Sequence, residues 1–102
     1  MKVRILRSAI EDLAEGRIFY ERQEQGIGDY FLDSLFADID SLAIYSCIHE
    51  IKFGFYRQLS KRFPYSIYYK IIGDEAVVFH VLDCRRDPNW IHKTLSEGLP
   101  PG

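Results

Sequence analysis

Apolar and polar positions alternate most clearly over residues 65–71, where Tyr65, Ile67, Tyr69 and Ile71 are separated by Ser66, Tyr68 and Lys70. This period of two is typical of a β-strand. Residues 72–75 read Ile-Gly-Asp-Glu, a turn signal in which Gly73 can take a positive φ. Residues 76–82 are apolar on both faces apart from His80, which predicts a strand inside the sheet. A shorter, mixed strand is predicted over residues 56–60.

Residues 83–95 predict an abrupt change from strand to helix. Arg85 and Arg86 follow the buried strand, and Asp87-Pro88 is typical of an N-cap followed by the first helical position. We therefore expect a short helix over residues 88–95. The two arginines should stand at the end of the most buried strand.

The first helix is predicted after a short edge strand over residues 2–6. Ser8 and Glu11 fit a capping box, which would start the helix there, and we expect it to end near Gln25. Its predicted buried stripe is Ile10, Leu13, Ala14, Ile18 and Tyr20. Its predicted solvent-facing residues are Glu11, Asp12, Glu15, Arg22 and Gln23.

A second amphipathic helix is predicted after the break at Gly26-Ile27-Gly28, with Asp29 as its cap. Its apolar positions recur at helical spacing: Leu32, Leu35, Phe36, Ile39, Leu42 and Ala43. So short a connection predicts an antiparallel helical hairpin. Residues 44–54 give no clear element.

This order predicts an α+β fold, β-α-α-β-β-β-α, in one domain spanning residues 1–102 with a loose tail at 96–102. The N-terminal helical hairpin should pack on a mostly antiparallel four-stranded sheet, with all helices on one face. The chain has no apolar run near ~18 residues and no signal-peptide pattern, so we expect neither a membrane span nor secretion.

Charge is distributed unevenly, although the net charge is only −2. Residues 1–51 hold five basic and ten acidic side chains, whereas residues 52–93 hold eight basic and four acidic. The asymmetry indicates two faces with different partners, or ordinary scatter. Cys47 and Cys84 do not make a disulfide framework, and the sequence leaves their pairing open.

Several local patterns, taken in order, resemble the RelE/ParE superfamily of toxins from type II toxin–antitoxin (plasmid stabilization) systems. The resemblance covers nearly the whole chain and is carried by Ala9, Asp12, Leu13, Tyr20-Glu21, Gly28, Phe31, Tyr56-Arg57, Phe63-Pro64-Tyr65, Val81-Leu82 and Arg85-Arg86-Asp87-Pro88. It implies a bacterial, cytoplasmic toxin neutralised by a cognate antitoxin. One branch of the superfamily cuts mRNA on the ribosome, and the ParE-like branch poisons DNA gyrase.

An mRNA endonuclease needs cations at the scissile phosphate and a group that moves a proton. The candidate cations are Arg57, Lys61, Arg62, Arg85 and Arg86, and the nearest acid–base candidate is His92. The nuclease branch often has a tyrosine or histidine close after its last arginine, but here Asp87-Pro88-Asn89-Trp90 follow. This departure and the mildly acidic chain favour the ParE-like branch; an mRNA endonuclease and an inactive antitoxin-binding member are the alternatives.

For binding a target or antitoxin, the candidates are Arg57, Arg62, Arg85, Arg86 and Trp90. The competing interpretation of the arginines is an exposed pair, one of which bridges to Asp83 or Asp87. The competing interpretation of Trp90 is that it packs the last helix on the sheet together with Ile91. We expect the Tyr65, Ile67 and Tyr69 face to be core and His80 to be a satisfied core histidine.

No cofactor is expected, and no metal. His80 and Cys84 would lie ~13 Å apart on one strand, too far to share an ion. The expected partners are an antitoxin with DNA gyrase, or with the ribosome and mRNA. The expected assemblies are a homodimer or a heterotetramer with the antitoxin.

Overall fold

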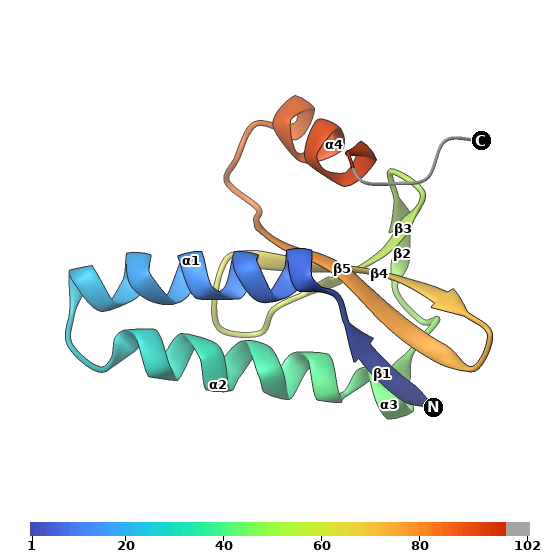
Figure 1. The fold of residues 1–102 in the computed structure, drawn as a ribbon, viewed down its shortest axis with the longest axis horizontal. Helices are drawn as coiled ribbons and strands as arrows, with labels where there is room; N and C mark the ends of the chain where they lie inside the picture. Colours follow the sequence, from blue (N-terminus) through green and yellow to red (C-terminus); the bar gives the residue numbers. More distant parts are fainter. Residues whose placement is uncertain (98–102) are drawn as a thin grey trace.

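A twisted five-stranded sheet separates a long helical hairpin from one short helix (Figure 1). The computed structural model describes residues 1–97. Its elements in chain order are β1 (Lys2–Ile5), α1 (Arg7–Gln23), α2 (Ile27–Asp40), α3 (Leu42–Tyr45), β2 (Glu50–Lys52), β3 (Phe55–Leu59), β4 (Tyr65–Ile72), β5 (Glu75–Asp83) and α4 (Pro88–Ser96). The strand order is β1-β5-β4-β3-β2, with β1 parallel to β5 and the other neighbours antiparallel.

The α+β class, the helical hairpin and the mostly antiparallel sheet are confirmed, but the predicted number of strands is wrong. The fifth strand, β2, lies within residues 44–54, where no element was expected. It is only three residues long and exposed throughout, so it has no apolar alternation to detect. It joins β3 through Phe53 and Gly54, both at positive φ, and a phenylalanine gives no turn signal there.

Strand β5 lies inside the sheet as predicted, between β1 and β4, and its residues 76–78 and 81–82 are buried. Gly73 has φ 63° in the β4–β5 turn, which confirms the predicted role of that glycine. The predicted edge strand at the N-terminus is also confirmed as β1.

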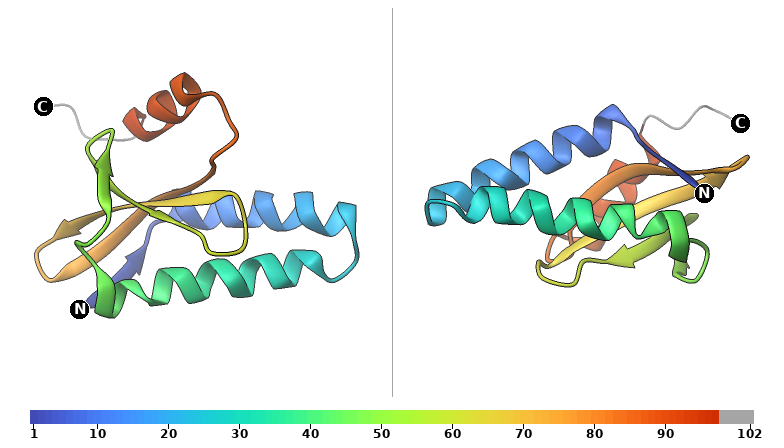
Figure 2. Two further views of the ribbon diagram at one scale, coloured as in Figure 1. Left: turned by 180° about the vertical axis from the view of Figure 1, so that it is seen from behind. Right: turned by 90° about the horizontal axis from the view of Figure 1, so that it is seen from below.

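The main core lies between the sheet and the α1–α2 hairpin, which covers one face (Figure 2). Phe31 of α2 is fully buried and its ring lies 4.9–5.2 Å from those of Tyr20, Phe63 and Tyr65. Gly16 permits this approach, because a Cβ there would come within 2.6 Å of the Phe31 ring. The face formed by Tyr65, Ile67 and Tyr69 is buried in this core, as predicted.

Helix α1 buries the predicted stripe only in part: Leu13 and Tyr20 are buried as predicted, and the other predicted members are not. The buried residues are Ala9, Leu13, Gly16 and Tyr20, whereas Ile10, Ala14 and Ile18 are exposed. At the remaining positions the buried stripe holds two small residues, Ala9 and Gly16. Close approach of the helices therefore outweighs the burial of two isoleucines.

The predicted helix starts are wrong for α1 and α2 and confirmed for α4. Helix α1 begins at Arg7 after Leu6, and Ser8 makes no capping contact. Helix α2 begins after Gly26, with Asp29 inside its first turn. Asp87 caps α4 as predicted, since its carboxylate accepts a hydrogen bond from the Asn89 backbone N–H at 2.9 Å.

Helix α4 packs on the sheet face opposite the hairpin, so the prediction that all helices share one face is wrong (Figure 1). Its Ile91 and Leu95 bury against Phe55, Tyr68 and Leu82. Strand β5 faces both layers, which is why its sequence is apolar on both sides. Ser96, predicted as tail, is the last residue of α4, and residues 98–102 of the predicted tail lie outside the described residues.

Within residues 1–97, no helix combines the length and the apolar character needed to cross a bilayer.

Candidate functional site

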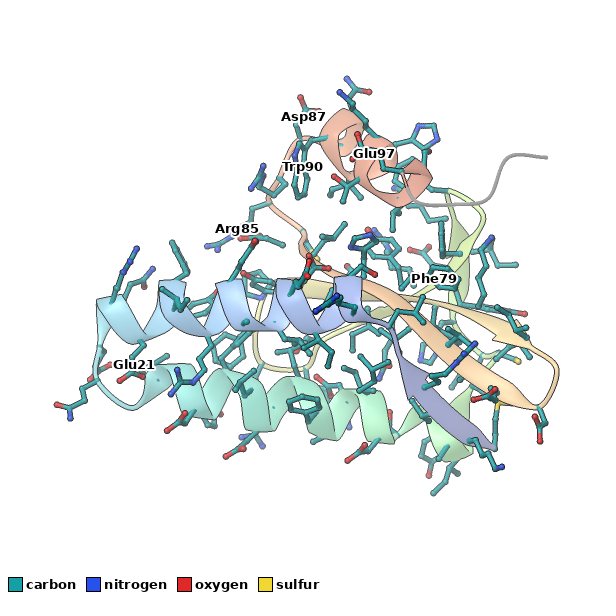
Figure 3. The ribbon with its side chains drawn as sticks, in the orientation of Figure 1. Glu21, Phe79, Arg85, Asp87, Trp90 and Glu97 are labelled. Atoms are coloured by element: carbon teal, nitrogen blue, oxygen red, sulfur yellow. The ribbon has the colours of Figure 1, made fainter. Side chains whose placement is uncertain are left out.

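The loop between β5 and α4 carries the two arginines that the sequence singled out. The Cys84 N–H donates to the Pro64 carbonyl at 2.8 Å, and the Arg86 N–H donates to the Asp83 carbonyl at 3.2 Å. These bonds fix the loop against the start of β4. Figure 3 shows Arg85 and Trp90 on the side of the molecule where α1 and α4 face each other.

Arg85 forms a two-bond ion pair with Asp83, through Nε at 3.0 Å and Nη2 at 2.8 Å. The hydrogen bonds from Arg85 lower the pKa of Asp83 below its ordinary value. Burial, with a smaller contribution from the Asp83 charge, raises the pKa of Tyr65 to about 12. The Arg85 side chain still keeps 59% of its surface exposed. The guanidinium is therefore oriented by Asp83 and open to a partner on its other side.

Arg86 lies over the Trp90 ring, with its guanidinium carbon 3.7 Å from the ring centroid. This cation–π contact joins the β5–α4 loop to the first turn of α4. Ile91 packs α4 on the sheet as predicted, whereas Trp90 remains 37% exposed and lies outside that cluster. The pair presents a flat, positively charged surface to solvent.

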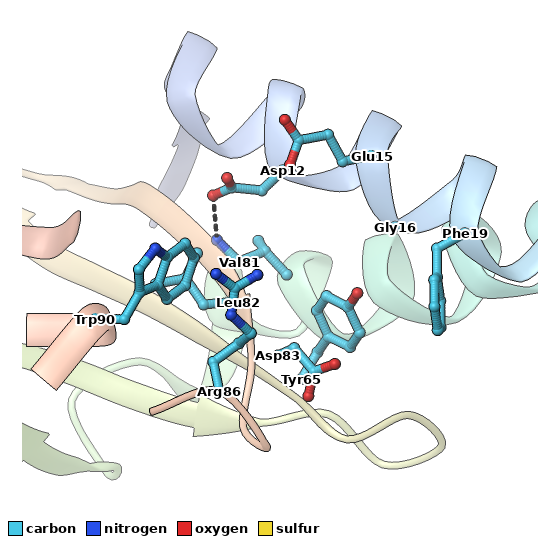
Figure 4. Close-up of a pocket in the computed structure, with 10 residues that line it drawn as sticks. All are labelled: Asp12, Glu15, Gly16, Phe19, Tyr65, Val81, Leu82, Asp83, Arg86 and Trp90. Atoms are coloured by element: carbon cyan, nitrogen blue, oxygen red, sulfur yellow. Dashed lines mark hydrogen bonds between the residues drawn. The ribbon is translucent and has the colours of Figure 1, made fainter. Parts of the chain in front are cut away.

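A groove of about 310 Å³ opens beside this pair, between α1 and the end of β5 (Figure 4). Arg86 and Trp90 form one wall, and Asp12, Glu15 and Phe19 of α1 form the other. A second hollow along α1 shares Glu15 and Phe19 with the first and continues to Ile18 and Arg22. The two make one surface along α1, the "α1 groove", lined by exposed apolar rings and charges of both signs.

Ser8 and Asp12 of α1 hydrogen-bond to a β-bulge in β5 and so hold α1 against this strand beside the groove. The β4–β5 register shifts so that Phe79 has no partner in β4. The Ser8 hydroxyl donates to the Phe79 carbonyl at 2.5 Å, and the Asp12 carboxylate accepts from the Val81 N–H at 3.0 Å. A β-bulge leaves backbone groups outside the ladder, and these side chains satisfy them.

Asp12 also lies 2.8 Å from His80 Nδ1. This confirms His80 as a hydrogen-bonded, mostly buried histidine. Asp12, predicted to face solvent, is instead a link between α1 and β5. One signal was present in the sequence: Ser8 and Asp12 are four positions apart, so they share a helix face and adjoin the small residues of the buried stripe.

The other predicted cations lie in separate places. Arg57 on β3 pairs with Glu50 of β2, while the Arg62 guanidinium donates to the Tyr30 hydroxyl at 2.7 Å. The Lys61 N–H donates to Asp38 at 3.3 Å. Arg57 and Lys61 line one hollow, and Lys61 and Arg62 line another beside α2. Neither of these hollows includes Arg85 or Arg86.

His92, the acid–base candidate, is on α4 and stacks on the Phe53 ring at 4.8 Å. It belongs to the contact between α4 and the β2–β3 turn. Arg85 and Arg86 therefore stand together with Trp90, while Arg57, Lys61, Arg62 and His92 are distributed around the rest of the sheet.

Both cysteines are free thiols. Among residues 1–97, no three His, Cys, Asp or Glu side chains gather closely enough to hold a metal ion. The chemistry offered by the Arg85–Arg86–Trp90 surface is that of recognition: oriented guanidinium groups, an exposed aromatic ring and an adjacent groove.

Comparison with known proteins identifies a family and a similar fold. The model of the family described as "ParE toxin of type II toxin-antitoxin system, parDE" matches residues 3–88. A solved chain of the chromosomal ParDE TA system from P. aeruginosa superposes with a TM-score of 0.71 at 16% identity, covering 79% of this chain and 92% of that one. No curated protein matches the sequence.

Proposed function

The chain belongs to the ParE toxin family of type II toxin–antitoxin systems, and from that premise we propose that it inhibits DNA gyrase by binding, with Arg85, Arg86 and Trp90 in the contact surface. The match over residues 3–88 carries the proposal. It covers the sheet, the hairpin and the loop bearing both arginines. Such a target would place the protein's action in the cytoplasm.

The geometry of the cations supports binding over RNA cleavage. A nuclease must bring a phosphate-binding cation and a proton-transfer group to the same scissile bond. Here His92 stacks on Phe53, and Glu50 pairs with Arg57. Arg85 and Arg86 instead lie beside an exposed tryptophan, a combination that is common where proteins bind other proteins.

The test is a supercoiling assay with purified gyrase and relaxed plasmid. The chain should block supercoiling, and Arg86→Ala should weaken inhibition about tenfold or more, since arginines at the centre of interfaces contribute about 1–2 kcal/mol or more. Arg7→Ala is the matched control, because Arg7 is almost fully exposed at the start of α1, outside the groove. Arg7→Ala should inhibit like the parent.

A parallel assay on translating ribosomes separates the two branches. The mRNA should remain intact, as read by primer extension. Site-specific cleavage that Arg85→Ala abolishes would establish an endonuclease instead. If the chain affects neither gyrase nor mRNA, and its expression without a partner leaves growth normal, it is an inactive antitoxin-binding member.

The family also implies an antitoxin, and we propose that its amphipathic segment occupies the α1 groove. Ile18 and Phe19 are each nearly half exposed there, and Arg22 and Arg86 flank them. An amphipathic helix or strand carrying acidic residues fits an apolar strip bordered by cations. The antitoxin gene should be a short reading frame beside this one.

Titration calorimetry with that antitoxin tests the placement. Phe19→Asp should weaken binding by about tenfold or more, because it places a charge in a desolvated contact. Ile72→Asp is the control: Ile72 is similarly exposed, but lies at the β4–β5 turn. Equal losses for both variants would contradict the α1 groove as the antitoxin site.

A further inference from the structure

The outer edge of β2 is an open row of backbone groups. β2 is the last strand of the sheet and pairs only with β3 in the described chain, through Glu50–Arg57, Ile51–Tyr56 and Lys52–Phe55. Its other side presents unpaired N–H and C=O groups, which form a template for another strand. Figure 1 shows the β2–β3 hairpin at the end of the molecule away from the α1–α2 turn.

Exposed apolar side chains gather in the sequence around this edge. Each of them keeps more than half of its surface in solvent: Ile44 (77%), Tyr45 (58%), Ile48 (73%) and Ile51 (67%). They occupy α3, the following turn and β2, within eight positions of the chain. Isolated exposed apolar residues are ordinary, but a run of them that leads into an unpaired strand indicates an interaction surface.

The edge is held rigidly at both ends. Cys47, before β2, and Phe53, after it, are the non-glycine residues with positive φ in the described chain, at 70° and 55°. The Tyr69 hydroxyl accepts a hydrogen bond from the Cys47 N–H at 3.1 Å and lies 2.5 Å from His49 Nδ1. The Phe53 ring stacks on His92. Positive φ at such residues persists only when surrounding contacts enforce it, so β2 is pre-organised as an edge.

The charges on β2 specify which strand it can accept. Glu50 and Lys52 project from one side of the strand and Ile51 from the other, because side chains alternate. An antiparallel copy of the same strand, centred on Ile51, would place each Glu50 opposite Lys52 of the second copy. The single strand is thus complementary to itself in that register, in charge and in its apolar centre.

We propose that a second copy of this chain pairs with the first through β2, in an isologous antiparallel dimer that continues the sheet across a two-fold axis. A two-fold axis at a strand edge requires antiparallel strands, so symmetry and charge agree on one arrangement. The Ile51 side chains would meet at the axis. One carboxylate oxygen of Glu50 can keep its ion pair with Arg57 while the other pairs with Lys52 of the second copy.

This interface is separate from the Arg85–Arg86–Trp90 surface and does not depend on the target of the toxin. β2 and β5 are separated in the sheet by β3 and β4. A dimer formed through β2 would present two such surfaces at once.

The test is a pair of charge reversals, measured by sedimentation velocity on the purified chain without antitoxin over a wide concentration range. The parent should dimerise. With Lys52→Glu, β2 carries acidic side chains at positions 50 and 52; with Glu50→Lys, it carries basic ones at both. Both cross-strand pairs then become repulsive, so each variant alone should dimerise at least about tenfold more weakly than the parent. Mixing the two variants should restore a dimer, because every opposed pair is then complementary.

Two further variants keep the result independent of folding. Ile51→Lys should abolish the dimer, whereas Ile18→Lys, an equally drastic change on exposed α1, should leave it intact; circular dichroism and thermal melts confirm that each variant is folded. A parent that stays monomeric throughout would overturn the proposal, and so would mixed charge variants that do not associate. An antitoxin that binds the parent but not Ile51→Lys, with the free chain monomeric, would assign the edge to the antitoxin.

Discussion

The two faces of the sheet are covered very differently. The hairpin face buries a large continuous cluster in which Phe31, Tyr20 and Tyr65 interlock, whereas the α4 face buries a small one around Phe55, Tyr68 and Leu82. Helix α4 has nine residues and contributes two buried side chains, while α1 and α2 together contribute most of the main core. The comparison indicates a stable platform on one side and a weakly attached helix on the other.

The proposed contact surface lies at the junction between these regions. Arg86 and Trp90 belong to the weakly attached side, and Asp12, Glu15 and Phe19 to the stable side. A groove between a fixed wall and a lightly held wall can adjust its width when a partner binds. The predictions below test this contrast, beginning with the largest effect.

Phe31→Ala should have the largest effect on stability. It removes a fully buried ring that contacts three other aromatic rings, which costs about 3–5 kcal/mol of unfolding free energy. Denaturant unfolding measures it, with the half-exposed Phe19→Ala as a control expected to change by less than about 0.5 kcal/mol. Similar losses in both variants would remove the distinction between core and groove.

Leu95→Ala should act locally. It removes one of the two buried anchors of α4, a loss of about 2–4 kcal/mol at the site, but the hairpin core does not depend on it. Hydrogen exchange should show faster exchange in α4 with little change in α1 and α2. Lys93→Ala on the exposed side of α4 is the control. Uniformly faster exchange throughout the chain would show that the faces form one cooperative unit.

Asp12→Ala should weaken the link between the helix and the bulge in β5. The Val81 N–H and His80 would lose their acceptor, at a cost of about 1–3 kcal/mol for buried groups left unpaired. The neighbouring Glu11→Ala removes an exposed carboxylate and should be nearly neutral. Thermal denaturation of the two variants compares them directly. Equal melting temperatures would contradict a structural role for Asp12.

The contribution of Asp83 to the pH dependence of the unfolding free energy should be the smallest effect. Arg85 lowers the pKa of Asp83 in the folded chain below the ordinary 3.8, so the unfolded chain binds the proton first. The stabilisation is complete above about pH 3.8 and disappears as the pH falls through the lowered folded pKa, amounting to about 1 kcal/mol or less for so exposed a pair.

Asp83→Asn removes this dependence. Stability curves of the parent and Asp83→Asn should therefore converge as the pH falls below 3.8 and separate above it. Asp74→Asn, in the exposed β4–β5 turn, is the matched control for removal of a carboxylate. A constant difference between the parent and Asp83→Asn at all pH values would contradict the linkage.

Local signals in the sequence predicted much of the fold because they report on local physics. Alternation over residues 65–71 gave β4, apolar character on both faces placed β5 inside the sheet, and Asp87-Pro88 marked the start of α4. The arginine pair was also placed correctly, exposed beyond the end of β5. Its partners were not predicted: Arg85 turns to Asp83 and Arg86 to Trp90.

The sequence by itself determined the longer helices and strands, although not β2, because propensity and periodicity act within a few residues. Tertiary structure decided which face α1 buries. Gly16 lets Phe31 approach, so α1 turns its small residues inward and exposes Ile18. The bulge at Phe79 likewise recruits Ser8 and Asp12 from a distant segment, and only the assembled sheet creates those unpaired backbone groups.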